Sequence, residues 1–244
     1  MKNKILNVKI DNLYLAEVIE NVELYLKSTK QHYIVTTNPE FIMAAQKDEE
    51  FKDILNKSDM SLSDGMGIKF AAPRFGWKLK QRITGVDLLL EITKVAEREG
   101  SSIYLLGARD DIPSFTAKRL IERFPNLKIV GAEKGYRSWH RRFKDKKLIE
   151  MINRRRPDIV FVAFGHVKQE KWIKKNLSKI PSVKIAMGVG GSFDYISGYV
   201  ERAPKMIRKI GLEWFYRLIK QPWRLPRIIT AVVKFSLAVL KNKT

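Results

Sequence analysis

The sequence has no cysteine and only three histidines. The lack of cysteine excludes disulfides, thiolate catalysis and cysteine-ligated metal centres. His32, His140 and His166 lie far apart, and none belongs to an H-x-x-x-H or H-E-x-x-H pattern, so we expect no histidine-based metal centre. No Asp-x-Asp pair occurs, although a nucleotide-sugar enzyme that binds a divalent cation is expected to carry one. If a diphosphate leaves, cationic side chains and backbone amides must neutralise it.

Long hydrophobic runs are also missing. The apolar stretch 228–240 contains Lys234 and has about 13 residues, well short of the ~20 that a membrane-spanning helix needs. Such a stretch can lie on a membrane without crossing it. No segment resembles a cleavable signal with a small-residue cleavage site, so we expect the protein to stay in the cytoplasm.

Positive charge is the strongest signal that the composition contains. The net charge is +21, which favours phosphate-rich partners and leaves nucleic acid, anionic lipid and nucleotide open. Residues 201–244 carry eleven Lys or Arg against two Glu, a local net charge of +9. Aromatic side chains lie among these cations, including Trp214, Phe215, Trp223 and Phe235. The mixture predicts either a segment at a membrane interface or a helical cap that packs its aromatic rings on the core.

Strand-like and helix-like patterns alternate before residue 198. The alternation predicts an α/β fold with a Rossmann-like, mostly parallel sheet and helices on both faces. Residues 1–197 are expected to form one catalytic domain, and residues 198–244 a basic, aromatic-rich helical appendage. Strands are predicted at 4–9, 32–36, 102–106, 128–130, 159–164 and 183–187, of which the first two form a βαβ opening with helix 14–29. Further helices are predicted near 85–99, 111–124, 143–155 and 168–179.

Two candidate motifs follow predicted strands, where α/β folds bind ligands. In T-T-N-P-E-F, hydroxyl and amide groups suit sugar or phosphate recognition, but Thr37 or Asn38 could simply cap a helix that begins at Pro39. Local sequence favours capping. In S-L-S-D-G-M-G, Asp64 could be the general base that glycosyl transfer to a hydroxyl requires, although Asp-Gly is also a common turn.

Three further motifs offer groups for anion binding. Q-R-I-T-G-V-D places Arg82 beside a helix start, where backbone amides and a guanidinium can hold phosphate. F-G-H-V-K-Q-E places Gln169 directly after a buried strand. M-G-V-G-G-S-F-D contains three glycines, Gly188, Gly190 and Gly191, which could cradle a phosphate through backbone amides. This glycine turn fits neither the dinucleotide-binding fingerprint nor the P-loop pattern.

In this order, the motifs resemble the WecG/TagA/CpsF family of bacterial glycosyltransferases, and within it the N-acetylmannosaminyltransferases of teichoic-acid linkage-unit synthesis. The resemblance covers about residues 8–228. Its anchors are T-x-N-P-E at 36–40, D-G-x-G at 64–67, R-x-T-G-x-D at 82–87, L-L-G at 105–107, G-Y at 135–136, K-Q-E at 168–170, G-V-G-G-S-F-D at 188–194, R-A-P at 202–204 and G-L-E-W-F-Y-R-L at 211–218.

The resemblance implies a fold of the GT-E type and an inverting, metal-independent transfer without a cofactor. The donor would be UDP-N-acetylmannosamine, and the acceptor a polyprenyl-pyrophosphate-linked N-acetylglucosamine at the inner face of the cell membrane. Asp64 would be the base. Donor contacts would come from Thr36, Asn38, Arg82 and Gln169, with Gly188, Gly190 and Gly191 near the nucleotide. The acceptor pyrophosphate and an anionic membrane surface would meet Arg217, Arg224 and Arg227.

One loop departs from the family pattern, and several alternatives stay open. Members usually carry a Pro before K-Q-E, whereas this loop reads Gly165, His166, Val167, Lys168. Related enzymes transfer other sugars, such as an N-acetylmannosaminuronic acid or a glucose-type unit. Self-association away from the membrane is a further hypothesis. The rivals from other classes are a nucleic-acid-binding protein and a membrane scaffold without chemistry, and the resemblance argues against a nucleic-acid partner.

Overall fold

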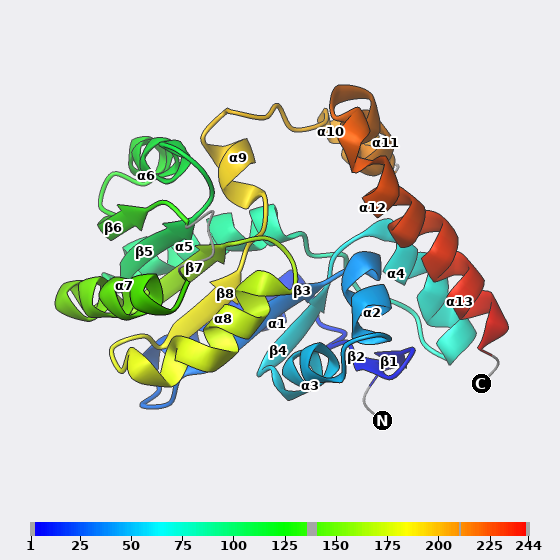
Figure 1. The fold of residues 1–244 in the computed structure, drawn as a ribbon, viewed down its shortest axis with the longest axis horizontal. Coiled ribbons are helices and arrows are strands. Elements are labelled where there is room, and N and C mark those ends of the chain that lie inside the picture. The colour runs from blue at the N-terminus through cyan, green and yellow to red at the C-terminus, as the bar shows by residue number, and fades with distance from the viewer. Residues whose placement is uncertain (1–2, 136–140, 210, 243–244) are drawn as a thin grey trace.

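The computed structural model describes residues 3–135, 141–209 and 211–242. Within these ranges, six strands form one parallel sheet in the order β4-β3-β8-β7-β5-β6 (Figure 1). The strands are β3 (His32–Thr37), β4 (Met60–Ser63), β5 (Ser102–Gly107), β6 (Lys128–Glu133), β7 (Ile159–Ala163) and β8 (Ile185–Gly188). The predicted parallel α/β sheet is therefore confirmed.

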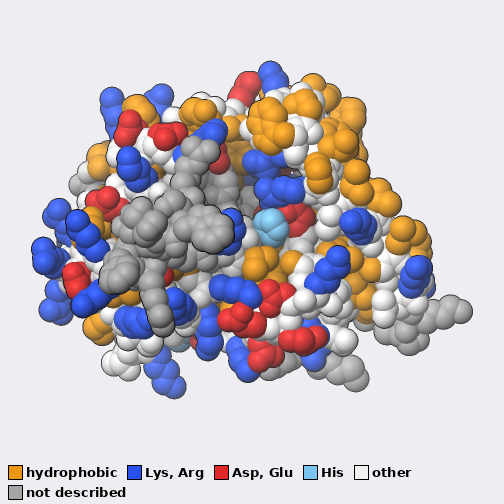
Figure 2. Space-filling model, viewed as in Figure 1, with side chains coloured by type: hydrophobic (Ala, Val, Ile, Leu, Met, Phe, Trp, Pro, Cys, Tyr) orange, Lys and Arg blue, Asp and Glu red, His pale blue; other side chains and the backbone are white. Residues whose placement is uncertain are grey.

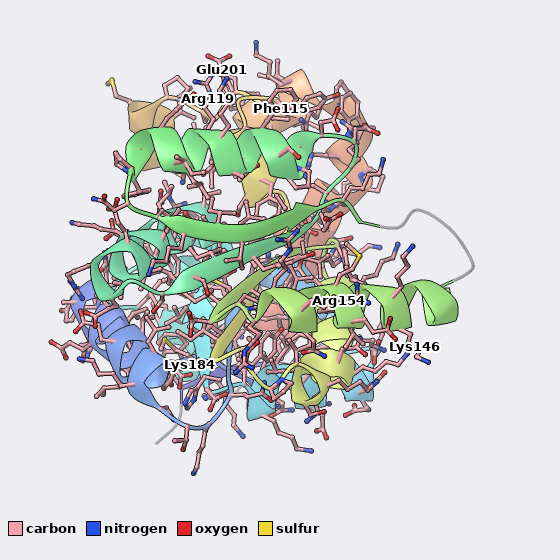
Figure 3. All side chains as sticks on the ribbon, turned by 90° about the vertical axis from the view of Figure 1, so that its left-hand side faces the viewer. Phe115, Arg119, Lys146, Arg154, Lys184 and Glu201 are labelled. Atoms are coloured by element: carbon pink, nitrogen blue, oxygen red, sulfur yellow. The ribbon has the colours of Figure 1, made fainter. Side chains whose placement is uncertain are left out.

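Helices cover both faces of the sheet, because successive side chains of each strand point to opposite faces. In β5, Tyr104 and Leu106 join one buried cluster, whereas Ile103 and Leu105 join the other. Figure 3 shows α6 and α7 on opposite sides of the sheet. The first face is covered by α2 (Pro39–Ala45), α3 (Glu49–Lys57), α7 (Arg141–Arg155) and α8 (Lys168–Asn176), which η2 (Leu177–Lys179) follows. The second is covered by α1 (Leu15–Lys27), α5 (Gly85–Glu99), α6 (Ile112–Arg123) and α9 (Ser192–Ile196).

The predicted strand at 4–9, and with it the βαβ opening, is wrong. These residues form an antiparallel hairpin of β1 (Lys4–Ile5) and β2 (Val8–Lys9), separate from the main sheet. Leu6 and Asn7 have φ values of 47° and 63°, the left-handed conformation that a two-residue hairpin turn requires. The apolar residues Ile5 and Val8 pair across the hairpin and are buried. A short apolar run cannot distinguish one strand from such a hairpin.

Residues beyond α9 form a chain of short helices that returns to the first face of the sheet. They are α10 (Lys205–Lys209), α11 (Glu213–Lys220), η3 (Pro222–Arg224), α12 (Leu225–Ile229), the π-helical η4 (Thr230–Lys234) and α13 (Phe235–Lys241). In Figure 1, α12, η4 and α13 run as one rod along α2 and α4 (Met66–Ala71), and the contacts of η4 and α13 agree. From η1 (Ala72–Phe75), Arg74 donates to the carbonyls of Val239 and Leu240, at 2.8 Å each.

The aromatic side chains of this tail, residues 198–242, fall into two groups. Phe235 is buried, and a Cβ at Gly67 would lie 3.4 Å from its ring, so it packs on the core as a helical cap would. Trp214, Phe215 and Trp223 are exposed, and Figure 2 shows hydrophobic side chains gathered over the tail. The expectation of an interfacial ring is therefore wrong for Phe235. None of the helices in the described ranges is long and apolar enough to cross a membrane.

Candidate active site

The carboxyl ends of the strands bring together most of the motifs that the sequence singles out. A cavity of about 1050 Å³ opens where β5, β7 and β8 end, and the tail closes one side of it. Its lining includes Arg109, Phe164, Lys168, Gly190, Gly191, Asp194, Trp223, Arg224 and Arg227. Thr36 lies near the end of β3, Asn38 follows β3, and Asp64 follows the neighbouring strand β4. None of these three residues is among the described residues that line the cavity. The site thus has two parts: the cavity, and the group of Thr36, Asn38 and Asp64 beside it, which we call the Asp64 side.

Asp64 lies where β4 ends, and its backbone and side chain are both held. Its amide donates to Thr37 O at 2.7 Å, and its Oδ2 accepts from the amide of Gly85 at 3.4 Å. Gly65 follows with a φ of 96°, a conformation that a side chain would disfavour. Burial raises the pKa of Asp64 to about 6, against the lowering effect of the Arg82 and Arg217 charges. A carboxyl with this pKa can accept a proton near neutral pH.

Thr36 and Asn38 shape the end of β3. Asn38 Oδ1 accepts from the amide of Phe41 at 3.0 Å, which confirms that Asn38 caps α2 ahead of Pro39. Thr36 is buried, and a Cβ at Gly85 would lie 3.2 Å from its Oγ1. The absence of a side chain at Gly85 therefore lets the start of α5 approach the end of β3.

Arg82 connects the Asp64 side of the site with the tail. Its Nη2 donates to the carbonyl of Arg208 at 3.3 Å, and its charge lowers the pKa of Asp64. The predicted position of Arg82 beside a helix start is confirmed, since α5 begins three residues later with Thr84 as its cap. The guanidinium is thus close enough to Asp64 to influence the same reacting groups.

Gln169 lies behind the glycine turn that follows β8. Its side chain is buried, its Oε1 accepts from the amide of Gly190 at 3.0 Å, and its Nε2 donates to Glu170 Oε1 at 2.6 Å. A Cβ at Gly188 would lie 2.6 Å from Gln169 Nε2 and 2.5 Å from Glu170 Oε1. Burial also raises the pKa of Glu170 to about 8. Gln169 therefore holds the glycine turn in place. Its position in the sequence did not indicate this structural role.

Three arginines of the tail surround the cavity and the glycine turn. Arg217 Nη2 would lie 3.7 Å from a Cβ at Gly191, and its guanidinium stacks on Tyr195 at 4.9 Å from the ring centroid. Arg227 Nε and Nη2 donate to Glu40 Oε2 at 2.9 and 2.8 Å. Burial, followed by the charges of Arg217 and Arg227, lowers the pKa of Arg224 to about 10. These guanidinium groups repel one another, and a bound anion would offset that repulsion.

The sequence analysis missed several charged residues of the cavity, among them Arg109 and Asp194. Arg109 follows β5, lines the cavity and stacks on Tyr199 at 4.9 Å from the ring centroid. Asp194 lies in the first turn of α9, where burial raises its pKa although Arg109, Arg224 and Arg217 act in the opposite direction. The position of Asp194 within G-V-G-G-S-F-D is a signal that could have indicated it.

The loop that departs from the family pattern has an unusual backbone. Val167 has φ 67° and ψ −49°, which is strained for a β-branched residue. A Pro could not adopt this φ, so the loop conformation itself differs from one that a Pro would allow. His166 Nε2 lies 4.0 Å from Glu40 Oε2, and burial lowers its pKa. The anchor residue Tyr136 lies outside the described residues.

The charges of the site suit an anionic ligand. No group of three or more His, Cys, Asp or Glu that could hold a metal ion occurs in the described ranges. The positive groups around the cavity include guanidinium groups, lysines such as Lys168 and the amides of the glycine turn, and all of these can stabilise a phosphate. A Rossmann-like sheet with a partly buried carboxyl, that of Asp64, and a cationic cavity at its carboxyl edge is the arrangement expected of an enzyme that transfers a group from a nucleotide.

The comparison with known proteins identifies the family within this class. The sequence model of the glycosyl transferase WecG/TagA/CpsF family matches residues 3–244, and the chain belongs to this family. The chain is 36% identical over 239 residues to an N-acetylglucosaminyldiphosphoundecaprenol N-acetyl-beta-D-mannosaminyltransferase of Bacillus subtilis (strain 168), covering 97% of this chain and 90% of the relative. Proteins of the same name from Staphylococcus aureus (strain MRSA252) and Bacillus spizizenii (strain ATCC 23059 / NRRL B-14472 / W23) are 31% and 35% identical. These alignments cover 99% and 93% of this chain, and 94% and 89% of the relatives.

Proposed function

We propose that this chain transfers N-acetylmannosamine from UDP-N-acetylmannosamine to N-acetylglucosaminyl-diphospho-undecaprenol, as in the synthesis of the wall teichoic acid linkage unit. The observation that carries the proposal is the carboxyl of Asp64, whose pKa of about 6 is set between burial and the cations Arg82 and Arg217. The names of the similar proteins supply the donor sugar and the acceptor.

In this proposal Asp64 removes the proton of the acceptor hydroxyl while its oxygen attacks C1 of the donor sugar. A bond forms between the acceptor oxygen and C1, the bond between C1 and the diphosphate oxygen breaks, and the configuration at C1 inverts. UDP leaves with the bonding electron pair. Arg217, Arg224 and the amides of the glycine turn neutralise its growing negative charge, which is the contribution that a metal ion would otherwise make.

The donor occupies the cavity in this proposal, with its diphosphate near Gly190 and Gly191. Thr36, Asn38 and Arg82 contact the donor from the Asp64 side, while Gln169 acts by holding Gly190. Gly188 contributes by leaving room for the Gln169 and Glu170 side chains. A donor of another class, such as a UDP-linked N-acetylmannosaminuronic acid or glucose, is the alternative within the same fold.

The tail, in this proposal, holds the enzyme on the inner face of the cell membrane. Its exposed apolar and aromatic side chains enter the headgroup region, and its cations lie near lipid phosphates. Arg224 and Arg227 then meet the acceptor pyrophosphate at the mouth of the cavity. Residues 198–244 would be a membrane-docking appendage to a catalytic domain at 1–197. The exposure of Trp214, Phe215 and Trp223 supports this arrangement.

The deciding experiment is UDP release from UDP-N-acetylmannosamine with a short-chain N-acetylglucosamine-pyrophosphate lipid, with EDTA present. We expect wild-type turnover in EDTA and a loss of at least about a hundredfold in Asp64→Asn, the scale of a lost general base. Asp53→Asn is the matched control, because Asp53 lies on α3 in an exposed ion pair with Lys57.

Three results would contradict the proposal. Turnover that stops in EDTA would exclude a metal-independent mechanism. Full activity in the folded Asp64→Asn variant would exclude Asp64 as the base. Release of UDP from a uronic acid or glucose donor, but not from the N-acetylmannosamine donor, would replace the donor sugar. Salt-sensitive oligonucleotide binding without any turnover would instead favour the nucleic-acid-binding alternative.

A further inference from the structure

Arg202 ties the beginning of the tail to the start of α5. Its Nη1 and Nη2 donate to Asp87 Oδ1 and Oδ2 at 2.6 and 3.0 Å, and Nη2 also lies 3.2 Å from Thr84 Oγ1. The bidentate pair joins residues that are 115 positions apart in the sequence. A planar guanidinium held by both carboxylate oxygens fixes orientation as well as distance.

The turn of α5 that Arg202 holds also orients Asp64. Thr84 Oγ1 accepts from the amide of Asp87 at 3.3 Å and donates to Asp87 Oδ2 at 2.6 Å. The next amide, that of Gly85, donates to Asp64 Oδ2. A shift of this turn would therefore move the donor that holds the Asp64 carboxyl.

Glu213, the first residue of α11, forms an ion pair with the same arginine and also affects the pKa of Asp64. Its Oε1 lies 3.8 Å from Arg202 Nε, and the two side chains are only 19% and 17% exposed. Arg202 Nε is buried and makes no hydrogen bond within the described residues, so Glu213 is a second counter-charge for Arg202 besides Asp87. Glu213, Arg82 and Arg217 are the charged groups that act on Asp64, together with the Gly85 amide.

These charges act in opposite directions on Asp64. The two arginines and the amide favour the carboxylate form, whereas the like charge of Glu213 favours the protonated form. A stronger base takes a hydroxyl proton more readily, up to the point where it is itself protonated at the working pH. Glu213 thus opposes the weakening of the base that the neighbouring cations cause.

We propose that Glu213 is a positioning residue that the tail joins, through Arg202, to the turn of α5 that holds Asp64, and that Arg202 is the link that keeps it there. The inference rests on the proposed function, in which Asp64 is the base. The tail then serves proton abstraction as well as ligand binding. Because Arg202 also grips the start of α5, one side chain sets both the hydrogen bond to Asp64 and a charge that acts on it.

The test is the pH dependence of kcat/KM in wild type, Glu213→Gln, Glu213→Asp and Arg202→Gln. In Glu213→Gln the pKa of Asp64 falls, so the acid limb of the profile moves to lower pH and the plateau rate drops. Glu213→Asp keeps the charge and is expected to keep the limb near its wild-type position. The control is Glu201→Gln, an equal charge change in the tail, since Glu201 lies on the outer surface (Figure 3). Its limb is expected to coincide with that of wild type.

Arg202→Gln separates a link from a simple charge effect. Removing a cation by itself would raise the pKa of Asp64 and move the limb to higher pH. Releasing Glu213 from its position would move the limb to lower pH, in the same direction as Glu213→Gln. Loss of the Gly85 hydrogen bond would also raise the Asp64 pKa, so the release of Glu213 is isolated by comparing Glu213→Gln in the wild-type and Arg202→Gln backgrounds. If Glu213→Gln moves the limb as far in the Arg202→Gln background as in wild type, the role of Arg202 is overturned. A Glu213→Gln limb that coincides with that of wild type would overturn the whole proposal.

A titration without substrate distinguishes this inference from the proposed function. The carboxyl carbons of aspartate are labelled with carbon-13, and the Asp64 signal is identified by its absence in Asp64→Asn. A lower Asp64 midpoint in Glu213→Gln supports the coupling even where no donor is turned over. An unchanged midpoint, alongside turnover that requires Asp64, would refute the coupling and leave the proposed function intact. Melting curves establish that each variant is folded.

Discussion

Helices α5 and α11 are both amphipathic, yet they treat their apolar residues in opposite ways. In α5, Leu88, Leu89 and Ile92 are fully buried against the sheet. In α11, no side chain is buried, and Trp214 and Phe215 face outward. The apolar face of α5 is buried when the chain folds, whereas that of α11 stays exposed, as expected of a surface that binds a partner. Positive charge follows the same division, since Arg217, Arg224 and Arg227, the arginines proposed to bind the donor and acceptor diphosphates, all belong to the tail.

The strongest test of this difference between α5 and the tail is to remove the exposed aromatic rings of the tail together. We expect the combined change of Trp214, Phe215 and Trp223 to Glu to abolish pelleting with anionic liposomes. Turnover of a long-chain acceptor in membranes should fall by about tenfold or more, because membrane binding scales with the apolar area inserted. The melting temperature should stay near wild type. Turnover of a short-chain acceptor should fall by less than turnover of the long-chain acceptor, and only because Trp223 also lines the cavity.

The matched control for this experiment is Phe115→Glu. Phe115 is exposed on α6, outside the tail, and Figure 3 shows it on the outer side of that helix. The control should pellet like wild type. If it loses membrane binding as well, or if the triple variant still pellets, then the tail is not the docking surface.

The comparison becomes sharper within a single helix of the tail. Phe235 of α13 is 2% exposed and joins the core cluster of the first face, whereas Leu237 is 52% exposed. Phe235→Ala is expected to lower the free energy of unfolding by about 3–5 kcal/mol, as core Phe truncations do. Leu237→Ala should change it by less than about 0.5 kcal/mol.

Urea denaturation measures both variants. Equal losses of stability would show that α13 packs as a whole, and would contradict the division of its residues into a core side and an outward side. A small loss in Phe235→Ala alone would show that this end of the tail is only loosely attached.

The sheet and the local caps could be predicted because their signals are local. Strand runs at 32–36 and 159–164 read directly as buried strands, and Asn38 before Pro39 read as a helix cap. Asp64 could be placed at the edge of the sheet, because a residue that follows a parallel strand lies at the carboxyl edge. The ordered motifs supplied the family.

The features that could not be predicted depend on distances across the fold. Nothing in the sequence pairs Arg202 with Asp87 or with Glu213, since each contact joins separate elements. Gln169 looked like a ligand contact because its strand was buried, but only the structure shows that it faces the amide of Gly190. Phe235 has the same local composition as Trp223, and only packing separates them. Periodicity reports which face of an element is apolar, not what lies against it.

Asp64 lies in the catalytic core, but like the exposed rings of the tail it is kept for function and not for stability. Its pKa is raised from the usual 3.8 to about 6 in the folded protein. The folded state therefore holds an extra proton between these values, and the contribution of Asp64 to stability declines as the pH rises through this window. Asp64→Asn removes that cost, so we expect the variant to melt at a higher temperature than wild type at pH 8, with a smaller difference at pH 4. Thermal unfolding at both pH values measures this effect, the smallest of those predicted. A difference that shrinks as the pH rises would mean that the folded environment favours the Asp64 carboxylate, and the argument for a strengthened base would fail with it.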